Sequence, residues 1–286
     1  MLVENQKLAE FAALVSSGDV RPFEGPLKVG VDLGTANIVM AVTDQDNRPV
    51  AGMTTHSTVV RNGIVVDYVG AVRAVRTMKA ALEEKLGVAL TKAATAIPPG
   101  ILDGNVRCIA NCVEGADLEV IKVMDEPTAA AAVLGIRDGA VVDVGGGTTG
   151  ISILRDGKVV YTADEATGGT HMTLVLSGYY DIGRDEAEKM KLDASQEQAV
   201  FPIVYPVVEK MASIVKRFVD GRQVKDLYVV GGACCFSEFE NVFEKILHIP
   251  THKPNDCLFV TPLGICLLYT SPSPRDGSLS RMPSSA

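Results

Sequence analysis

The chain has 286 residues with 27 basic and 35 acidic side chains, so its formal net charge is −8. Apolar residues make up 47% and charged residues 22% of the chain, which is the composition of a globular protein with a core rather than of a disordered one. The acidic balance argues against a nucleic-acid-binding face, because phosphate recognition needs clustered Lys and Arg. The length fits one large domain or two closely packed lobes.

Six cysteines, at positions 108, 112, 234, 235, 257 and 266, form no Cys-x-x-Cys pair and have no His at zinc-ligand spacing. We expect free thiols in a reducing cytosol. Residues 1–17 contain no signal-peptide core, and no apolar run reaches the roughly 18–20 residues that span a bilayer. We therefore expect a cytoplasmic protein without a transmembrane segment.

Residues 4–17 are predicted to form a helix, since their apolar side chains recur with helical spacing. A linker rich in Gly and Pro follows. Three interpretations of this helix remain open: packing on its own domain, docking as a targeting helix of microcompartment cargo, or membrane anchoring, which its Lys/Arg-poor polar face disfavours. Its stripe consists of Leu8, Phe11, Ala12 and Val15.

From Lys28 onward, strand and helix patterns alternate, which is typical of an α/β fold. Ser237 is a plausible cap of the last predicted helix, and Asp156-Gly157 predicts a hairpin turn. We expect strands at 28–34, 37–44, 62–68, 91–98, 118–124, 140–145, 149–164 and 226–232, and helices at 70–86, 103–115, 125–135, 170–195, 203–220 and 237–248.

One segment is repeated within the chain. Val31-Asp32-Leu33-Gly34-Thr35 is matched 111 residues later by Val142-Asp143-Val144-Gly145-Gly146-Gly147-Thr148. Each copy reads as a strand, an acidic residue and a glycine–threonine turn, so two related lobes would each present one turn. The predicted divisions are an N-terminal helix and linker (1–27), lobe I (28–139), lobe II (140–254), a return segment to lobe I (255–266) and a disordered or non-native tail (267–286).

The familiar phosphate-binding loops do not explain these turns. A Walker A motif is absent. Gly145, Gly147 and Gly150 have the G-x-G-x-x-G spacing of a dinucleotide site, but that motif must open a helix and here it precedes a strand.

A pair of acidic–glycine turns suits a triphosphate instead. Glycine lets backbone N–H groups approach phosphate oxygens, and the threonines add hydroxyl donors. Asp32 and Asp143 can hold the water shell of Mg²⁺, which keeps several of its waters. The alternative is two ordinary hairpins whose Asp side chains bond local N–H groups.

Four segments in order, VGVDLGTAN, DEPTAAAAVLG, VVDVGGGTTGISIL and VVGGA, resemble the phosphate-one, connecting, phosphate-two and adenosine motifs of the actin and heat-shock-chaperone ATPase superfamily. The resemblance runs from about residue 28 to 266 and is strongest to the ethanolamine-utilisation protein J family. It implies an α/β, two-lobed actin-like ATPase with duplicated, ribonuclease H-like lobes and a nucleotide cleft between them.

The resemblance assigns roles residue by residue. Asp32 and Asp143 would hold the metal through water, and Glu126 would orient the attacking water; a helix cap is the alternative role of Glu126. Glu188 and Lys191 would contact ribose and adenine, unless they only occupy an exposed helix face. The remaining nucleotide-binding residues would be Gly34, Thr35, Gly145, Gly146, Gly147, Thr148, Thr149, Gly231 and Gly232.

The resemblance also implies ATP and Mg²⁺ as cofactors and a chaperone-like activity. No lysine near the γ-phosphate can be assigned, so we expect either slow hydrolysis or nucleotide binding without hydrolysis. No peptide-binding domain is recognised after Cys266, so a client would bind to the ATPase lobes or to residues 1–17. The implied partner is ethanolamine ammonia-lyase or its microcompartment. A filament-forming actin homologue and a small-molecule kinase stay open as alternatives; the kinase would use Asp103 as its base, although Asp103 also reads as a helix cap.

Overall fold

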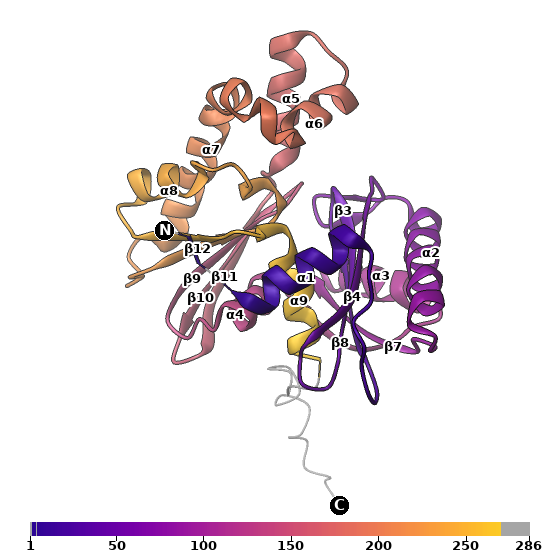
Figure 1. The fold of residues 1–286 in the computed structure, drawn as a ribbon. Helices are drawn as coiled ribbons and strands as arrows, with labels where there is room; N and C mark the ends of the chain where they lie inside the picture. Colours follow the sequence, from indigo (N-terminus) through magenta and orange to yellow (C-terminus); the bar gives the residue numbers. More distant parts are fainter. Residues whose placement is uncertain (1, 4, 270–286) are drawn as a thin grey trace, which may run out of the picture.

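The computed structural model describes residues 2–3 and 5–269 (Figure 1). Most of the predicted tail, residues 270–286, lies outside the described residues. Two β-sheets stand side by side, each covered by helices, so the chain has the predicted α/β architecture with two lobes.

The lobe I sheet has the strand order β4-β3-β2-β7-β8. Antiparallel hairpins join β2, β3 and β4, whereas β7 and β8 run parallel to β2. β3 is buried along almost its whole length, because helices cover both faces of the sheet. The strands span Lys28–Leu33 (β2), Asn37–Thr43 (β3), Pro49–His56 (β4), Lys92–Ile97 (β7) and Glu119–Asp125 (β8).

The lobe II sheet repeats this order as β11-β10-β9-β12-β13 and adds the short strand β1 at its edge, parallel to β13. The internal repeat seen in the sequence therefore corresponds to a repeated sheet topology. The strands span Leu2–Val3 (β1), Gly139–Val144 (β9), Thr149–Arg155 (β10), Lys158–Glu165 (β11), Leu227–Val230 (β12) and Thr251–Pro254 (β13).

The outer helices lie at the predicted places, except that one of them is divided in two; three corrections follow. The predicted helix 170–195 is two helices, because the chain turns at Asp181, whose φ is +54°. Of the predicted strand 62–68, only Ile64–Val65 is a strand, and it forms a short hairpin with Val60–Arg61. The elements are β5 (Val60–Arg61), β6 (Ile64–Val65), α2 (Tyr68–Leu86), α3 (Asp103–Glu114), α5 (Gly169–Tyr180), α6 (Arg184–Leu192), α7 (Glu197–Val219) and α8 (Phe239–Leu247).

The third correction concerns the cap of α8. This helix begins at Phe239 without a side-chain cap. Ser237 instead donates both its N–H and its hydroxyl to the Glu197 carboxylate, so it joins α8 to the start of α7. The expectation of free thiols is met, since none of the six cysteines forms a disulfide.

Two helices, α4 (Glu126–Leu134) and α9 (Val260–Leu267), cross between the sheets (Figure 1). A Cβ added to Gly264 of α9 would collide with the carbonyl of Ala129 on α4. The alanines of α4 therefore permit close helix packing, as the sequence indicated, and this crossing joins the two lobes.

One described helix, Ala194–Val219, is long and apolar enough to cross a membrane by length and composition alone, contrary to our expectation from the sequence; 44% of its apolar window is buried inside the protein. Its buried face, which includes Val204, Val208 and Met211, belongs to the apolar core of lobe II. The core helix of a water-soluble fold passes the same test.

The N-terminal helix α1 (Gln6–Ser17) packs on lobe I. Phe11 is fully buried. Its ring stands edge-on to that of Phe259, with 5.6 Å between centroids, and a Cβ at Gly52 of β4 would collide with it. The structure thus shows α1 packed on its own domain.

We expect Phe11→Ala to lower the free energy of unfolding by about 3–5 kcal/mol, the usual cost of removing a buried aromatic ring. Urea unfolding followed by circular dichroism measures this change. Lys7→Ala, on the exposed side of the same helix, should change it by less than about 0.5 kcal/mol. A loss below about 0.5 kcal/mol for Phe11→Ala would instead favour a detachable targeting helix.

Candidate functional site

The two glycine–threonine turns meet face to face between the lobes. The β2–β3 turn contains Thr35 and Ala36, and the β9–β10 turn contains Gly146 and Gly147. A Cβ at Gly146 would lie 2.9 Å from the Ala36 Cβ, and one at Gly147 would lie 2.8 Å from the Thr35 hydroxyl. Any larger side chain would push the turns apart, so glycine is what allows the two lobes to touch here.

A cavity of about 70 Å³ lies at this meeting point, well below the roughly 300–1,000 Å³ of small-molecule sites. A triphosphate can enter only if the turns separate, so the structure represents a closed cleft. The cavity is lined by most of the predicted site residues, namely Asp32, Gly34, Thr35, Glu126, Asp143, Gly145, Gly146, Gly147, Thr148, Gly231 and Gly232.

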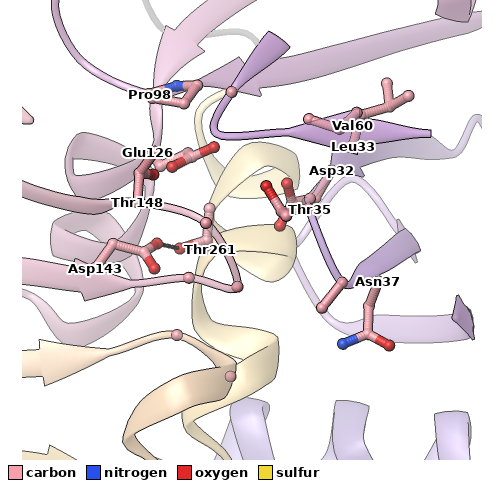
Figure 2. Close-up of a pocket in the computed structure, with 18 of the residues that line it drawn as sticks. Asp32, Leu33, Thr35, Asn37, Val60, Pro98, Glu126, Asp143, Thr148 and Thr261 are labelled. Atoms are coloured by element: carbon pink, nitrogen blue, oxygen red, sulfur yellow. Dashed lines mark hydrogen bonds between the residues drawn. The ribbon is translucent and has the colours of Figure 1, made fainter. Parts of the chain in front are cut away.

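Three carboxylates approach the cleft from three elements (Figure 2). Asp32 and Asp143 are the penultimate residues of β2 and β9, and Glu126 is the first residue of α4. Burial, reinforced by the Asp143 carboxylate, raises the pKa of Asp32 to about 7. Burial raises the pKa of Glu126 well above its usual value, with further contributions from Asp143 and Asp32, and burial also raises the pKa of Asp143.

Glu126 can face the cleft because the preceding residue, Asp125, caps α4. The Asp125 carboxylate accepts the Thr128 N–H at 3.0 Å and is the N-cap of α4. The cap role considered for Glu126 thus belongs to Asp125. Glu126 follows at the positive end of the helix dipole and points toward the cleft.

Asp143 is held from two sides. The Thr261 hydroxyl of α9 donates to its Oδ2 at 2.6 Å, as the dashed line in Figure 2 shows. Gly231, with φ +95°, lies so close to the other carboxylate oxygen that a Cβ there would collide with it. The loop at Gly231 thus packs directly on the Asp143 carboxylate.

The second turn is anchored by α5. The N–H groups of Gly169 and Thr170 donate to the carbonyls of Gly145 and Gly146 at 3.0 and 2.8 Å. Thr149 does not reach the cleft: it is fully buried and its hydroxyl donates to the Thr167 carbonyl at 2.8 Å. The structure therefore does not support the predicted contact of Thr149 with phosphate.

Glu188 and Lys191 pair with each other outside the cleft lining. The Lys191 ammonium lies 2.7 Å from the Glu188 carboxylate and donates to the Thr173 hydroxyl at 2.9 Å. The Lys191 side chain is only 8% exposed, so the interpretation as an exposed helix face is wrong. The ammonium lies 3.3 Å from the Cβ position of Gly169, beside the second turn.

Three residues near the cleft were missed from the sequence: Asn37, Thr261 and Asp164. Asn37 and Thr261 line the cavity. Asp164 faces Gly150 across the β10–β11 pair; burial raises its pKa to about 7, and its Oδ1 is buried without a hydrogen-bond partner. Distant elements bring Thr261 and Asp164 to the cleft, which a single sequence does not reveal, whereas Asn37 lies two residues after Thr35 and could have been included from the sequence.

Within residues 2–3 and 5–269, no cluster of three or more His, Cys, Asp or Glu side chains is arranged to hold a metal ion directly. The carboxylate oxygens of the cleft are the hard ligands that Mg²⁺ prefers, and a cation would favour the ionised form of Asp32, whose pKa is raised by burial and by the Asp143 carboxylate.

Asp103, the candidate base of a kinase, is exposed in the first turn of α3 and does not line the cavity. Leu102 is the N-cap of that helix and Asp103 makes no cap hydrogen bond, so the cap interpretation is wrong as well.

Comparison with known proteins identifies relatives of the whole chain. A family model described as type IV pilus assembly protein PilM matches residues 136–256. The ethanolamine utilization protein EutJ of Salmonella typhimurium is 46% identical over 241 residues, which cover 84% of this chain and 85% of that protein.

Two solved structures extend the comparison. The crystal structure of EutJ from Carboxydothermus hydrogenoformans is similar with a TM-score of 0.87 and 48% identity, covering 92% of this chain and 97% of that one. MreB5 of Spiroplasma citri bound to AMPPNP has a TM-score of 0.68 at 17% identity, covering 86% and 96%, and shares the actin-like fold. The chain therefore belongs to the EutJ family of ethanolamine utilization proteins and has a two-lobed, actin-like ATPase fold.

Proposed function

We propose that this protein binds ATP with Mg²⁺ between its lobes, hydrolyses it slowly, and acts as a chaperone-like switch in ethanolamine utilisation. One observation carries the proposal: two equivalent glycine–threonine turns meet at a cleft that also receives Asp32, Glu126 and Asp143. Ordinary hairpins do not explain this arrangement, because burying three carboxylates together is unfavourable unless a cation joins them.

The chain's own groups divide the work as follows. The N–H groups and hydroxyls of both turns bind the phosphates. Asp32 and Asp143 hold the waters of Mg²⁺, which supplies positive charge against the phosphates. Glu126, at the start of α4, orients the attacking water and accepts its proton at the carboxylate. Gly231 and Gly232 border the adenosine, with Glu188 and Lys191 beyond them.

Slow turnover follows from the charges at the cleft. Within the described residues, the cavity lining contains no Lys or Arg. Charge that develops on the transferred phosphoryl group is then stabilised by N–H groups and the metal alone, and a single missing donor typically costs about 10²–10³ in rate.

The switch arises because ATP must separate turns that touch in the closed cleft. The lobes would move about the crossing of α4 and α9, where Gly264 and Ala129 meet. A protein partner that distinguishes the two arrangements would be bound and released with the nucleotide. We propose ethanolamine ammonia-lyase or its microcompartment as that partner, and the cytoplasm as the place of action.

We expect ATP to bind with Mg²⁺ and to be hydrolysed slowly. Glu126→Gln should lower the hydrolysis rate about 10²-fold while leaving ATP affinity within about threefold, because it removes the group that activates water. Asp32→Asn should weaken Mg²⁺-dependent ATP binding. Calorimetry and phosphate release measure these changes.

Asp103→Asn is the matched control and should leave both quantities unchanged, because its carboxylate does not line the cavity. Unaltered binding and turnover in both Glu126→Gln and Asp32→Asn would refute the proposal. A requirement for a hydroxyl-bearing co-substrate, with loss of activity in Asp103→Asn, would establish a kinase instead.

Stability should depend on pH through Asp32. The folded protein keeps this carboxyl protonated up to about pH 7, whereas its ordinary pKa is 3.8. Between pH 4 and 7 the carboxyl therefore ionises in the unfolded chain alone, which lowers the stability of the folded state as pH rises through that range. Asp32→Asn stays neutral. Without nucleotide, it should raise the melting temperature by about 2–8 °C at pH 8 and have little effect at pH 4.

Thermal unfolding across pH 4–9 checks this expectation. Asp46→Asn, at an exposed site with 75% of its side chain accessible, provides the control and should show no such pH dependence. An effect of Asp32→Asn that is equal at pH 4 and pH 8 would contradict the assigned cause.

The partner can be tested directly. Inactivated ethanolamine ammonia-lyase should regain activity faster with this protein and ATP than with Glu126→Gln and ATP. Electron microscopy of the same samples separates the filament alternative: polymers that form with ATP across protein concentrations, without any effect on the lyase, would favour the actin-homologue function.

A further inference from the structure

A run of large apolar side chains is exposed where β6 leads into α2. Ile64, Val66, Tyr68 and Val69 are 47%, 53%, 45% and 64% exposed. These four residues lie within six positions and make up an exposed apolar patch; apolar residues that gather on a surface mark interaction sites. Figure 1 shows α2, which begins at Tyr68, at the outer edge of lobe I.

The patch continues into a groove of about 710 Å³ beside α2. The groove has a firm wall: the Tyr68 hydroxyl donates to the Asn111 carbonyl at 3.1 Å, and a Cβ at Gly115 would lie 2.9 Å from Val72. We call it the α2 groove; it is lined by Tyr68, Val69, Val72, Arg73, Arg76, Thr77, Ala80 and Gly115.

The charge of the α2 groove is opposite to that of the whole chain. Its charged lining residues are Arg73 and Arg76, whereas the chain carries a net charge of −8. Arg76 donates to the Gly115 carbonyl and lies 3.5 Å from Asp117, which fixes its guanidinium beside the groove. Asp117 offsets part of the charge of Arg76, so the charge complementarity rests mainly on Arg73. An apolar floor with an arginine beside it complements a segment that has apolar residues on one side and carboxylates next to them.

We propose that the α2 groove and its apolar entrance dock an acidic amphipathic helix of a partner protein. The α2 groove runs along α2, a helix of 19 residues. Such a groove fits a helical occupant that presents apolar residues at i, i+3, i+4 and i+7. The charge complementarity selects an acidic occupant over a neutral or basic one.

The docking surface is linked to the nucleotide cleft through the β5–β6 hairpin, a step that rests on the proposed function. Val60 and Gly63 line the cleft cavity, and a Cβ at Gly147 of lobe II would lie 2.9 Å from the Asn62 N atom. Ile64 and Val66 follow immediately. Separation of the lobes releases the hairpin contact, so nucleotide in the cleft changes the affinity for the docked helix.

The test uses the full chain and two fluorescein-labelled synthetic helices of 18 residues. Both have Leu at i, i+3, i+4 and i+7; one has Glu at the flanking positions and the other has Lys there. Fluorescence anisotropy should show at least tenfold tighter binding of the Glu helix. Arg73→Glu and Val69→Asp should each weaken that binding at least tenfold.

Arg48→Glu, at an exposed arginine with 67% of its side chain accessible in the β3–β4 turn of the same lobe, is the matched control and should leave binding unchanged. Melting temperatures verify that each variant is folded. Equal binding of the two helices, or unchanged binding in both groove variants, would overturn the proposal. Sedimentation showing a dimer that Val69→Asp disperses would replace it with docking of a second copy.

The link is tested by measuring Glu-helix affinity with and without saturating ATP and Mg²⁺. We expect at least a threefold change, and the helix should change ATP affinity by the same factor. Unchanged helix affinity together with calorimetric ATP binding would refute the link. Absence of ATP binding in calorimetry would refute the proposed function, while the nucleotide-free anisotropy data would still decide the docking.

Discussion

The constraint on which the structure depends is the convergence of three carboxyl groups in one closed cleft, where Asp143 is buried and Asp32 and Glu126 are half-buried. Asp32 comes from lobe I, Asp143 from lobe II and Glu126 from the helix between them. Desolvation raises the pKa values of all three carboxyl groups, and repulsion by neighbouring carboxylates adds to this for Asp32 and Glu126, so the site opposes ionisation of its own side chains. A divalent cation reverses this opposition, because it stabilises the charged carboxylates that the empty fold destabilises.

Small residues allow the closest backbone contacts between the lobes. Gly146 and Gly147 bring the second turn against the first, and Gly264 brings α9 against Ala129. The lobes also share a buried apolar cluster, in which Val39 of β3 and Val141 of β9 pack together with residues of α4 and α9. Buried apolar area therefore holds the lobes together, while the two turns at the cleft touch mainly through backbone and small side-chain atoms.

The repeated turns could be predicted from the sequence because strand, carboxylate and glycine–threonine turn are all local, and each lies within seven residues. The direction of the Thr149 side chain follows from the two-residue period of a strand. Adjacent residues point to opposite faces, so Thr148 lines the cleft while Thr149 is fully buried. Asp164 and Thr261 could not be predicted, because the pairing of β10 with β11 and the return of α9 bring them in.

The sequence predicted a strand over residues 62–68, which is longer than the two-residue strand in the structure. This difference in length affects the surface near the cleft. The actual element is a two-residue hairpin whose tip touches lobe II, followed by exposed apolar residues rather than by a paired strand. A long strand would bury these side chains in a sheet. A short hairpin leaves Ile64 and Val66 exposed and joins them, within six residues, to Val60 and Gly63 at the cleft. The short β5–β6 hairpin therefore both leaves these apolar side chains exposed and connects them to the cleft through a few residues of chain.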